Sequence, residues 1–397
     1  MKNIAFIMTT LPVPTVKGGA VETLVESLIN RNEEYRKFKI EVYSIFNEEA
    51  CKIAKNYKNT TFTFIKNKNL SDSITAAFIR MANKILKIKI PEDLLYLFKI
   101  RRKSIGKYYD SVIVENRPQY IPYLYDHIGE TRQYYLHLHN EHFSRQYKNY
   151  KKFEKYNLKY IAVSNYIKKT ILETGVSNDN IFVLKNAVNI EDFADADKKR
   201  EEIRLKFDIT PSEKVLLYCG RISPEKGIKE LIQAFVKIKE KSNYKLLIVG
   251  ASWFSSTIKN EYQKNIENLA KEVSDRIFFT GYMAHDCIWE AYAAADVCCF
   301  PSVWNEPGAG ALVLLEALAA GKAIIASATG GTTEVISNDC AVIVKVDEKY
   351  VDNLAKGIEY LCDNDAIRRE MGRQAKMISK NYSLKTYYEN FFKIMEC

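Results

Sequence analysis

The feature that most constrains the fold is an alternation of short apolar runs with longer amphipathic stretches, sustained along the whole chain. The apolar runs are rich in Val, Ile, Leu and Phe and read continuously, without polar residues at every second position. Such strands are typical of parallel sheets buried on both faces, and strands that alternate with helices predict right-handed crossovers. The expected strands are residues 4–8, 40–43, 61–65, 112–115, 134–138, 160–163, 215–219, 245–249, 277–280, 297–300, 323–326 and 341–344.

This pattern restarts once. A charged stretch without periodicity runs from Glu191 to Lys206, and a new apolar run begins at Val215. The chain has 397 residues, enough for two domains. We therefore expect an α/β protein with two doubly wound Rossmann-like domains facing each other across a cleft, at 1–190 and 191–380. We expect a helix at about 381–397 that packs back on the first domain.

The composition favours a soluble globular protein, with 47% hydrophobic and 27% charged residues. No apolar stretch reaches the length of about 18 residues that a spanning helix needs. The apolar start, residues 1–8, lacks a cleavage site and is interpreted as a strand rather than a signal peptide. The eight cysteines show no metal-binding spacing, and Cys298-Cys299 lies in an apolar run. Reduced thiols are typical of the cytoplasm, which is the predicted location.

The net charge of +10 is unevenly distributed. Residues 1–190 hold 31 basic and 18 acidic side chains, whereas residues 191–397 hold 28 and 31. The window 52–107 alone has 14 basic and 3 acidic residues, and it mixes cations with large apolar side chains at 85–90 and 94–103. This mixture favours a peripheral position on an anionic membrane surface. A soluble lysine-rich surface is the alternative.

Three loops of the second half follow predicted strands. The first is Gly220-Arg221-Ile222-Ser223-Pro224-Glu225-Lys226-Gly227. The forked guanidinium of Arg221 and the compact ammonium of Lys226 both suit a diphosphate. In the second, a glycine-rich turn at 307–310 precedes an apolar helix, whose first amides form an anion site. The third, Ser327 to Glu334, carries Gly330-Gly331, which lets a ligand approach the backbone. Each loop alone is equally consistent with an ordinary surface turn.

Glu316 lies within that apolar helix, where a buried carboxylate is costly unless hydrogen bonds reach it. The two hydroxyls of a ribose would supply them. A glutamate at the helix edge that reaches solvent is the alternative.

The first half has weaker signals of the same kind. Gly18-Gly19 follows the first strand and opens a helix, and Glu115-Asn116-Arg117 follows another strand. His137 and His139 share one face of a strand end. A polar cluster at the cleft is the favoured interpretation there, and no metal site is predicted, because no known carboxylate–histidine spacing accompanies them.

Together these motifs resemble the retaining glycosyltransferases of family 4, which have the GT-B fold. The resemblance covers residues 215–340 and rests on the Gly220–Gly227 loop, the later loops and the pair Glu306 and Glu316. It extends loosely into the first half through Gly18-Gly19, Glu115-Asn116-Arg117 and His139-Asn140.

The resemblance implies a role for each matching residue. Arg221 and Lys226 would neutralise the donor diphosphate beside Gly220, and Glu316 would hold the ribose. The loop at Tyr282 would pair with the base, and His139 would face the transferred sugar. Glu306 and the turn would contact that sugar, and Gly18 and Gly19 would lie beside the phosphate and acceptor. The donor-binding turn comprises Gly308, Ala309, Gly310, Ala311 and Leu312.

One departure affects Glu306. The family usually has seven residues between its two glutamates, but nine separate Glu306 from Glu316 here, and the position of the usual first glutamate is Gly308. Either the longer turn still aims Glu306 at the sugar, or the turn amides act alone. Loops absorb such insertions at small entropic cost.

The expected function is transfer of a sugar from a nucleoside-diphosphate sugar, UDP favoured and GDP the alternative, to a glycan or lipid-linked acceptor in surface polysaccharide or glycolipid synthesis. No cofactor or metal is expected, since cations and amides already face the diphosphate. Glu115, Asn116 and Arg117 are candidates for the acceptor side. A non-catalytic GT-B partner subunit or membrane-associated binding protein is the rival hypothesis. A nucleic-acid partner is not expected, because the second half is acidic and lacks a recognition motif.

Overall fold

The computed structural model describes residues 1–8, 10–16, 19–66, 77, 81, 85, 93–147, 149–250, 261–304 and 312–397. It divides the chain into an N-terminal unit, Met1–Leu184 with Tyr388–Cys397, and a C-terminal unit, Lys185–Tyr387. The division therefore falls at Leu184, a few residues before the expected position. The last ten residues belong to the N-terminal unit.

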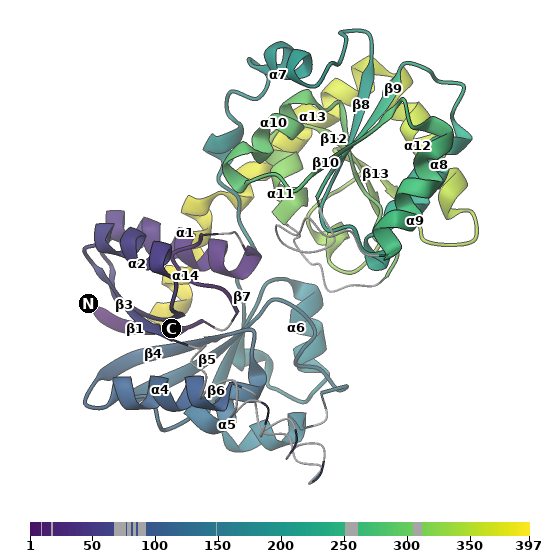
Figure 1. Ribbon diagram of the computed structural model, residues 1–397. Coiled ribbons are helices and arrows are strands. Elements are labelled where there is room, and N and C mark those ends of the chain that lie inside the picture. Colours follow the sequence, from purple (N-terminus) through teal and green to yellow (C-terminus); the bar gives the residue numbers. More distant parts are fainter. Residues whose placement is uncertain are drawn as a thin grey trace. The chain divides into compact units, whose positions relative to one another are not determined.

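The N-terminal unit contains a parallel sheet in the order β3-β2-β1-β4-β5-β6-β7. Its helices cover both faces: α1, α2 and α14 lie on one, and α4 and α5 on the other (Figure 1). Its strands are β1 (Lys2–Ile7), β2 (Phe38–Ile45), β3 (Thr60–Ile65), β4 (Tyr108–Glu115), β5 (Glu130–Leu138), β6 (Leu158–Ala162) and β7 (Ile181–Val183). Its helices include α1 (Ala20–Tyr35), α2 (Glu48–Ile53), α4 (Leu94–Ser104), α5 (Ile121–Leu124), α6 (Asn165–Leu172) and most of α14 (Leu384–Glu396).

The C-terminal unit contains a second parallel sheet, in the order β10-β9-β8-β11-β12-β13. One apolar core packs α10 and α11 against it, and the other packs α8 and α12 on the opposite face (Figure 1). Its strands are β8 (Lys214–Cys219), β9 (Tyr244–Val249), β10 (Ile277–Gly281), β11 (Val297–Phe300), β12 (Ala323–Ser327) and β13 (Ala341–Val344). Its helices include α7 (Arg200–Lys206), α8 (Ile228–Lys237), α9 (Glu261–Leu269), α10 (Ile288–Ala294), α11 (Leu312–Ala319), α12 (Tyr350–Asp363) and α13 (Asp365–Ser379).

The predicted class, two doubly wound Rossmann-like domains, is confirmed. Each strand expected from an apolar run is present, and the structure adds β7. Cys298 and Cys299 lie fully buried in β11, as their apolar neighbours indicate. In both sheets the strand order reverses once, between β1 and β4 and between β8 and β11. Ligands bind beyond the carboxyl ends of the strands at such a reversal, so these two positions locate the candidate site.

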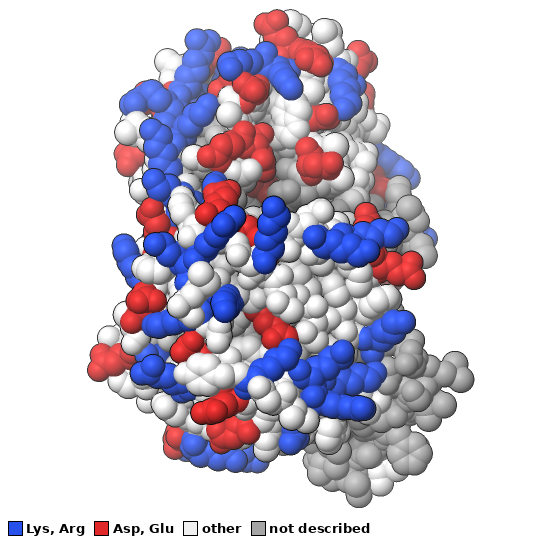
Figure 2. All heavy atoms as spheres, turned by 90° about the vertical axis from the view of Figure 1, so that its left-hand side faces the viewer, with Lys and Arg blue, Asp and Glu red and all other residues white. Residues whose placement is uncertain are grey.

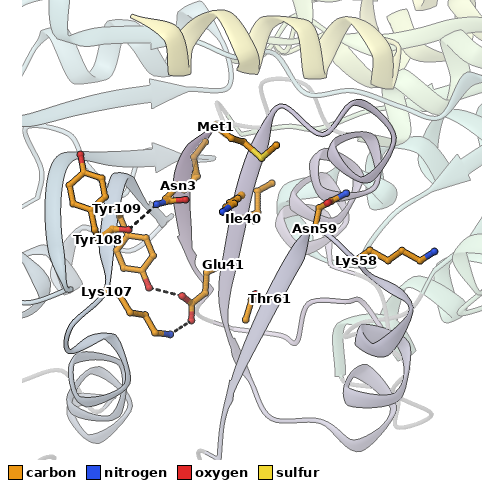
Figure 3. A pocket seen from close by; sticks show the side chains of 12 residues that line it. Met1, Asn3, Ile40, Glu41, Lys58, Asn59, Thr61, Lys107, Tyr108 and Tyr109 are labelled. Atoms are coloured by element: carbon orange, nitrogen blue, oxygen red, sulfur yellow. Dashed lines mark hydrogen bonds and ion pairs between the residues drawn. The ribbon is translucent and has the colours of Figure 1, made fainter.

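The opposite, amino edge of the N-terminal sheet holds an open hollow of about 530 Å³. Glu41 of β2 lies in it between β3 and β4, as Figure 3 shows. Its carboxylate accepts hydrogen bonds from the Tyr109 hydroxyl at 2.6 Å and the Lys107 ammonium at 2.5 Å. These contacts join β2 to the start of β4 across the intervening strand β1. Because they occupy the carboxylate that dominates the hollow, we assign this region to sheet stability.

The end of α14 is held against the N-terminal sheet by aromatic packing. Phe391 is 1% exposed, and its ring centroid lies 5.9 Å from those of both Phe6 and Phe38. The Tyr388 hydroxyl donates to Asn32 Oδ1 at 2.8 Å. The last residues of the chain therefore complete the apolar core of the first unit.

Replacing Phe391 by Ala should lower the free energy of unfolding of the N-terminal unit by about 3–5 kcal/mol, because a buried ring leaves a cavity. Native-state hydrogen exchange of β1 and β2 would measure the loss. Phe392→Ala is the matched control, since Phe392 is half-buried and its removal should cost less. Equal losses in the two variants would contradict this account of the packing.

Candidate active site

The donor-side site lies where the C-terminal sheet reverses its order. A pocket of about 70 Å³ opens between the ends of β8 and β11. Lys226 contributes to its wall, as do the backbone after Cys219 and the start of α11. The full lining is Tyr218, Cys219, Gly220, Lys226, Phe300, Pro301, Ser302, Val313, Leu314, Thr329 and Thr332. The first and third loops predicted in the second half therefore meet at one position, beside the start of α11.

The loop after β8 is locked against the end of β11. Gly227 has φ +68°, and a Cβ on it would overlap the Pro301 carbonyl oxygen. The Val303 amide donates to the Glu225 carbonyl at 3.1 Å. Only glycine permits this approach. The close contact places Lys226 beside the β11 exit and explains why a glycine ends the loop.

The two predicted cations differ in their surroundings. The Arg221 side chain is 43% exposed, and its guanidinium lies 3.5 Å from Glu225 Oε1. Lys226 is half-buried and lines the pocket. An exposed guanidinium that is held, among the described residues, by one weak pair can turn towards an incoming anion at little cost. The arrangement therefore suits a ligand that brings its own negative charge.

Glu316 is buried in α11, with 6% exposure. The Tyr292 hydroxyl of α10 lies 2.8 Å from Glu316 Oε2, and His285 Nε2 lies 3.9 Å from Oε1. Burial raises the pKa of Glu316, and the hydrogen bond from Tyr292 and the nearby His285 oppose that rise. This carboxylate is therefore enclosed, rather than at a solvent-facing helix edge, and Tyr292 and His285 join it.

Sequence reasoning missed Tyr292 and His285. Tyr292 lies in an alanine-rich apolar helix, where nothing marks it as a partner of a carboxylate, and His285 lies in a short loop before α10. The other donor-side predictions are partly placed: Tyr282 follows β10 and is 42% exposed, and Leu312 begins α11. Predictions that lie outside the described residues are Gly18, Glu306, Gly308, Ala309, Gly310 and Ala311.

The N-terminal unit builds its own polar cluster where β1, β4 and β5 end. Glu115, at the end of β4, is fully buried and accepts from His137, within β5, and from His139, directly after it. His137 Nδ1 lies 3.1 Å and His139 Nε2 3.0 Å from Glu115 Oε2. Strand register makes His137 the direct neighbour of Glu115. The predicted polar cluster is therefore present, and its central member is a carboxylate.

Charge and burial act in opposite directions on this cluster. Burial opposes ionisation of Glu115, but the two histidines outweigh it and hold the pKa of Glu115 at about 2. Burial, and then His137, lower the pKa of His139 below its usual value, against the pull of Glu115. Glu115 is thus a carboxylate at neutral pH. Its oxygens are turned towards the two histidines.

Neighbouring residues complete this cluster. Asn116 accepts from the His139 amide at 3.2 Å through its side chain, and Arg117 donates to Thr10 Oγ1 at 2.9 Å across the β1/β4 reversal. Glu22, on the first turn of α1 after Gly19, accepts from the Leu11 amide at 3.1 Å. Burial raises the pKa of Glu22. Glu22 was not predicted to act here, although it follows the quoted glycine pair.

Glu115, His137 and His139 are also the ligand types that bind divalent cations. One ligand atom of each lies within 4.8 Å of the others. Sequence spacing could not reveal this, because the carboxylate comes from one strand and the histidines from the next. The hydrogen bonds account for Glu115, whereas His137 Nε2 is buried with no hydrogen-bond partner among the described residues.

Comparisons with known proteins show what this chain is similar to. Residues 199–377 match the family described as "Glycosyl transferases group 1". The protein YtcC of Bacillus subtilis (strain 168) is 27% identical over 385 residues, which cover 94% of this chain and 86% of that protein. The lipopolysaccharide 1,2-N-acetylglucosaminetransferase of Salmonella typhimurium (strain LT2) is 33% identical over 196 residues, 48% of this chain and 50% of that enzyme.

Among solved structures, Anabaena HepE in complex with UDP and glucose has a TM-score of 0.75 at 18% identity, and each chain is covered completely. The fold is thus that of the GT-B glycosyltransferases. The C-terminal unit matches the group 1 glycosyl transferases over residues 199–377, and the similarity to named glycosyltransferases assigns the chain to this class of enzyme.

Among the described residues, the structure contains no helix long and apolar enough to cross a membrane.

Replacing Glu115 by Gln should lower the midpoint of thermal unfolding, because an amide offers one acceptor oxygen where the carboxylate serves two histidines. Each hydrogen bond to a charged group contributes about 1.5–3 kcal/mol. Differential scanning calorimetry would record the shift. Glu130→Gln, an exposed change at the start of β5, is the control and should leave the midpoint in place. A midpoint for Glu115→Gln that equals the control's would show that the carboxylate charge is not needed.

Proposed function

We propose that this chain transfers a sugar from a UDP-sugar to a hydroxyl group of a glycan or lipid-linked acceptor. The observation that carries the proposal is the pocket between β8 and β11, where Lys226 faces the helix start of α11 and Glu316 lies one turn further along that helix. A cation, the amides at the start of a helix and a buried carboxylate match a diphosphate followed by a ribose. HepE has solved structures in complex with UDP and with UDP-glucose, which favours uracil as the base.

In the proposed reaction, the bond between the anomeric carbon and the leaving diphosphate breaks, and a bond to the acceptor oxygen forms. Negative charge grows on the leaving phosphate, and Arg221 and Lys226 stabilise it. Glu316 holds the ribose, and its hydrogen bond with Tyr292 is either replaced by the ribose or kept alongside it. The family resemblance supports retention of the anomeric configuration, with the leaving phosphate accepting the acceptor's proton.

We also propose that the reaction needs no metal ion. The positive charge that a metal would supply is already present in Arg221 and Lys226, and the amides at the start of α11 add partial positive charge. His139 would face the transferred sugar with its ring held by Glu115. Asn116 and Arg117, half-buried at the β4 exit, would contact the acceptor.

Calorimetric titration with UDP, GDP, TDP, ADP and CMP, each with and without EDTA, tests the donor assignment. UDP should bind selectively and equally well in EDTA. Glu316→Gln should weaken UDP binding, whereas Glu348→Gln, an exposed change, should not. Arg221→Ala and Lys226→Ala should each reduce turnover on the order of 10²–10³. Selective binding of another nucleotide would assign that nucleotide, in place of UDP, to the donor. Loss of binding in EDTA would contradict the metal-free mechanism.

The N-terminal unit, we further propose, rests on anionic membrane lipid, where a lipid-linked acceptor would be found. In the described part of the basic window, Phe98 is 55% and Ile105 77% exposed at α4, beside the exposed cations Arg102 and Lys103. Figure 2 shows a gathering of Lys and Arg side chains in the lower right part of one face. Apolar side chains next to cations suit the interface of an anionic bilayer.

Flotation with vesicles of phosphatidylcholine and phosphatidylglycerol tests the membrane proposal. The protein should float with them, and about 0.5 M salt should release it, because salt screens surface charges. Arg102→Glu with Lys103→Glu should abolish flotation. Lys151→Glu with Lys152→Glu, an equal charge change at exposed positions outside the window, should not. Flotation that neither double substitution nor salt reduces would contradict the membrane proposal.

A further inference from the structure

A second hollow of the C-terminal unit lies at the amino edge of its sheet. It measures about 550 Å³ and is lined by the starts of β8, β11 and β12 and by one face of α13. The strands are parallel, so this edge is opposite the one where Gly220 and Ser302 line the donor pocket. The hollow is thus separate from the site described above.

The lining of this hollow is strongly cationic. It carries three carboxylates, those of Asp197, Asp296 and Asp365. Against these stand Arg200, Lys214, Lys322, Arg368, Arg369, Arg373 and Lys376. The second half of the chain as a whole has more acidic than basic residues, 31 against 28. The positive charge here is therefore concentrated locally, and it does not reflect a generally basic domain.

Part of this charge has a structural explanation. Helix C-termini lie at the amino edge of a parallel sheet, and their free carbonyls attract cations. Arg200 donates to the Ala295 carbonyl at 2.6 Å and pairs with Asp296 at 2.8 Å. Arg368 donates to the Leu361 carbonyl at 2.8 Å and pairs with Asp365 at 2.6 Å. These two arginines and both carboxylates serve the fold.

Lys322, Arg373 and Lys376 are not explained in this way. Lys322 is 6% exposed, and its ion-pair partner among the described residues is Asp197, an exposed side chain 3.6 Å away. Lys376 shares the same carboxylate at 3.5 Å. Arg373 pairs with Glu370 on the exposed side of α13. A buried ammonium is costly without a close counter-charge, and one shared surface carboxylate supplies little.

Close packing holds the basic face of α13 against β12. A Cβ on Gly372 would overlap the Gly321 carbonyl oxygen. Arg368, Gly372, Arg373 and Lys376 are spaced so that they share one face of the helix. The cations of this face are therefore positioned around Lys322 by the fold itself. Burial, with Arg200 nearby, lowers the pKa of Lys322, and a bound anion would reverse that shift.

We propose that this hollow binds a phosphate group, which contacts the Lys322 ammonium and is flanked by Arg373 and Lys376. A doubly charged tetrahedral anion satisfies several donors at once, which one carboxylate of Asp197 does not. The phosphate group belongs either to a soluble molecule or to a lipid headgroup. The proposal does not depend on the donor assignment, because the two sites lie at opposite edges of the sheet.

The experiment is calorimetric titration of the full chain carrying Arg221→Ala and Lys226→Ala, which silences phosphate binding at the donor pocket. Two probes are compared: inorganic pyrophosphate, and dihexanoyl phosphatidic acid below its micelle concentration. One equivalent of at least one probe should bind. Adding Arg373→Ala with Lys376→Ala should weaken that binding about tenfold or more, since about 1.4 kcal/mol is tenfold.

Lys349→Ala with Lys356→Ala is the matched control, because it removes the same charge from exposed positions at α12. These control changes should leave affinity within about twofold, as screened surface charges do. Preference for pyrophosphate identifies a soluble ligand, and preference for the lipid identifies a headgroup. Binding of neither probe, or binding equally weakened by the α12 and α13 changes, overturns the proposal.

Discussion

The C-terminal unit depends on one largely enclosed carboxylate, that of Asp296, whose side chain is 9% exposed. It accepts from the Val215 amide at 2.8 Å, and it pairs with Arg200 and Arg204 of α7 at 2.8 and 3.2 Å. Asp296 stands directly before β11 and Val215 lies in β8, so this contact fixes the two central strands to one another at their amino ends. Since the strands are short and rigid, their exits are fixed as well, and the donor pocket opens between those exits.

The N-terminal unit also has a central buried carboxylate, but at the other end of a strand and with different partners. Glu115 lies at the carboxyl end of β4, and its partners are two imidazoles rather than guanidiniums. A carboxylate fully neutralised by arginines has no remaining chemistry, and Asp296 is accordingly structural. A carboxylate that accepts from imidazoles fixes their tautomers and orientation, as the second shell of an active site does. The same residue class therefore joins two strands of one sheet and holds two histidine rings in the other.

The fold was largely predictable because buried parallel strands leave continuous apolar runs. The ends of those strands were not, since residues such as Glu130 and Thr131 at the start of β5 are polar and project beyond the core. Polar loops at strand exits were recognisable in the sequence, and the one with Lys226 lines the pocket between β8 and β11. Tyr292 was not recognisable, because a tyrosine inside an apolar helix looks like core until its hydroxyl is seen beside Glu316.

The amino edge of a parallel sheet has a general electrostatic property that bears on its cations. Helices return antiparallel to the strands, so their negative ends gather there, and some cations at that edge serve only to balance them. Arginines bonded to helix carbonyls, such as Arg200 and Arg368, meet that requirement. Lys322 differs in kind, because no carbonyl or close carboxylate among the described residues accepts from its ammonium. Lys322 is a buried cation that lines a hollow and that the helix dipoles do not require. Such a cation distinguishes a ligand site from a helix end whose charge is simply balanced.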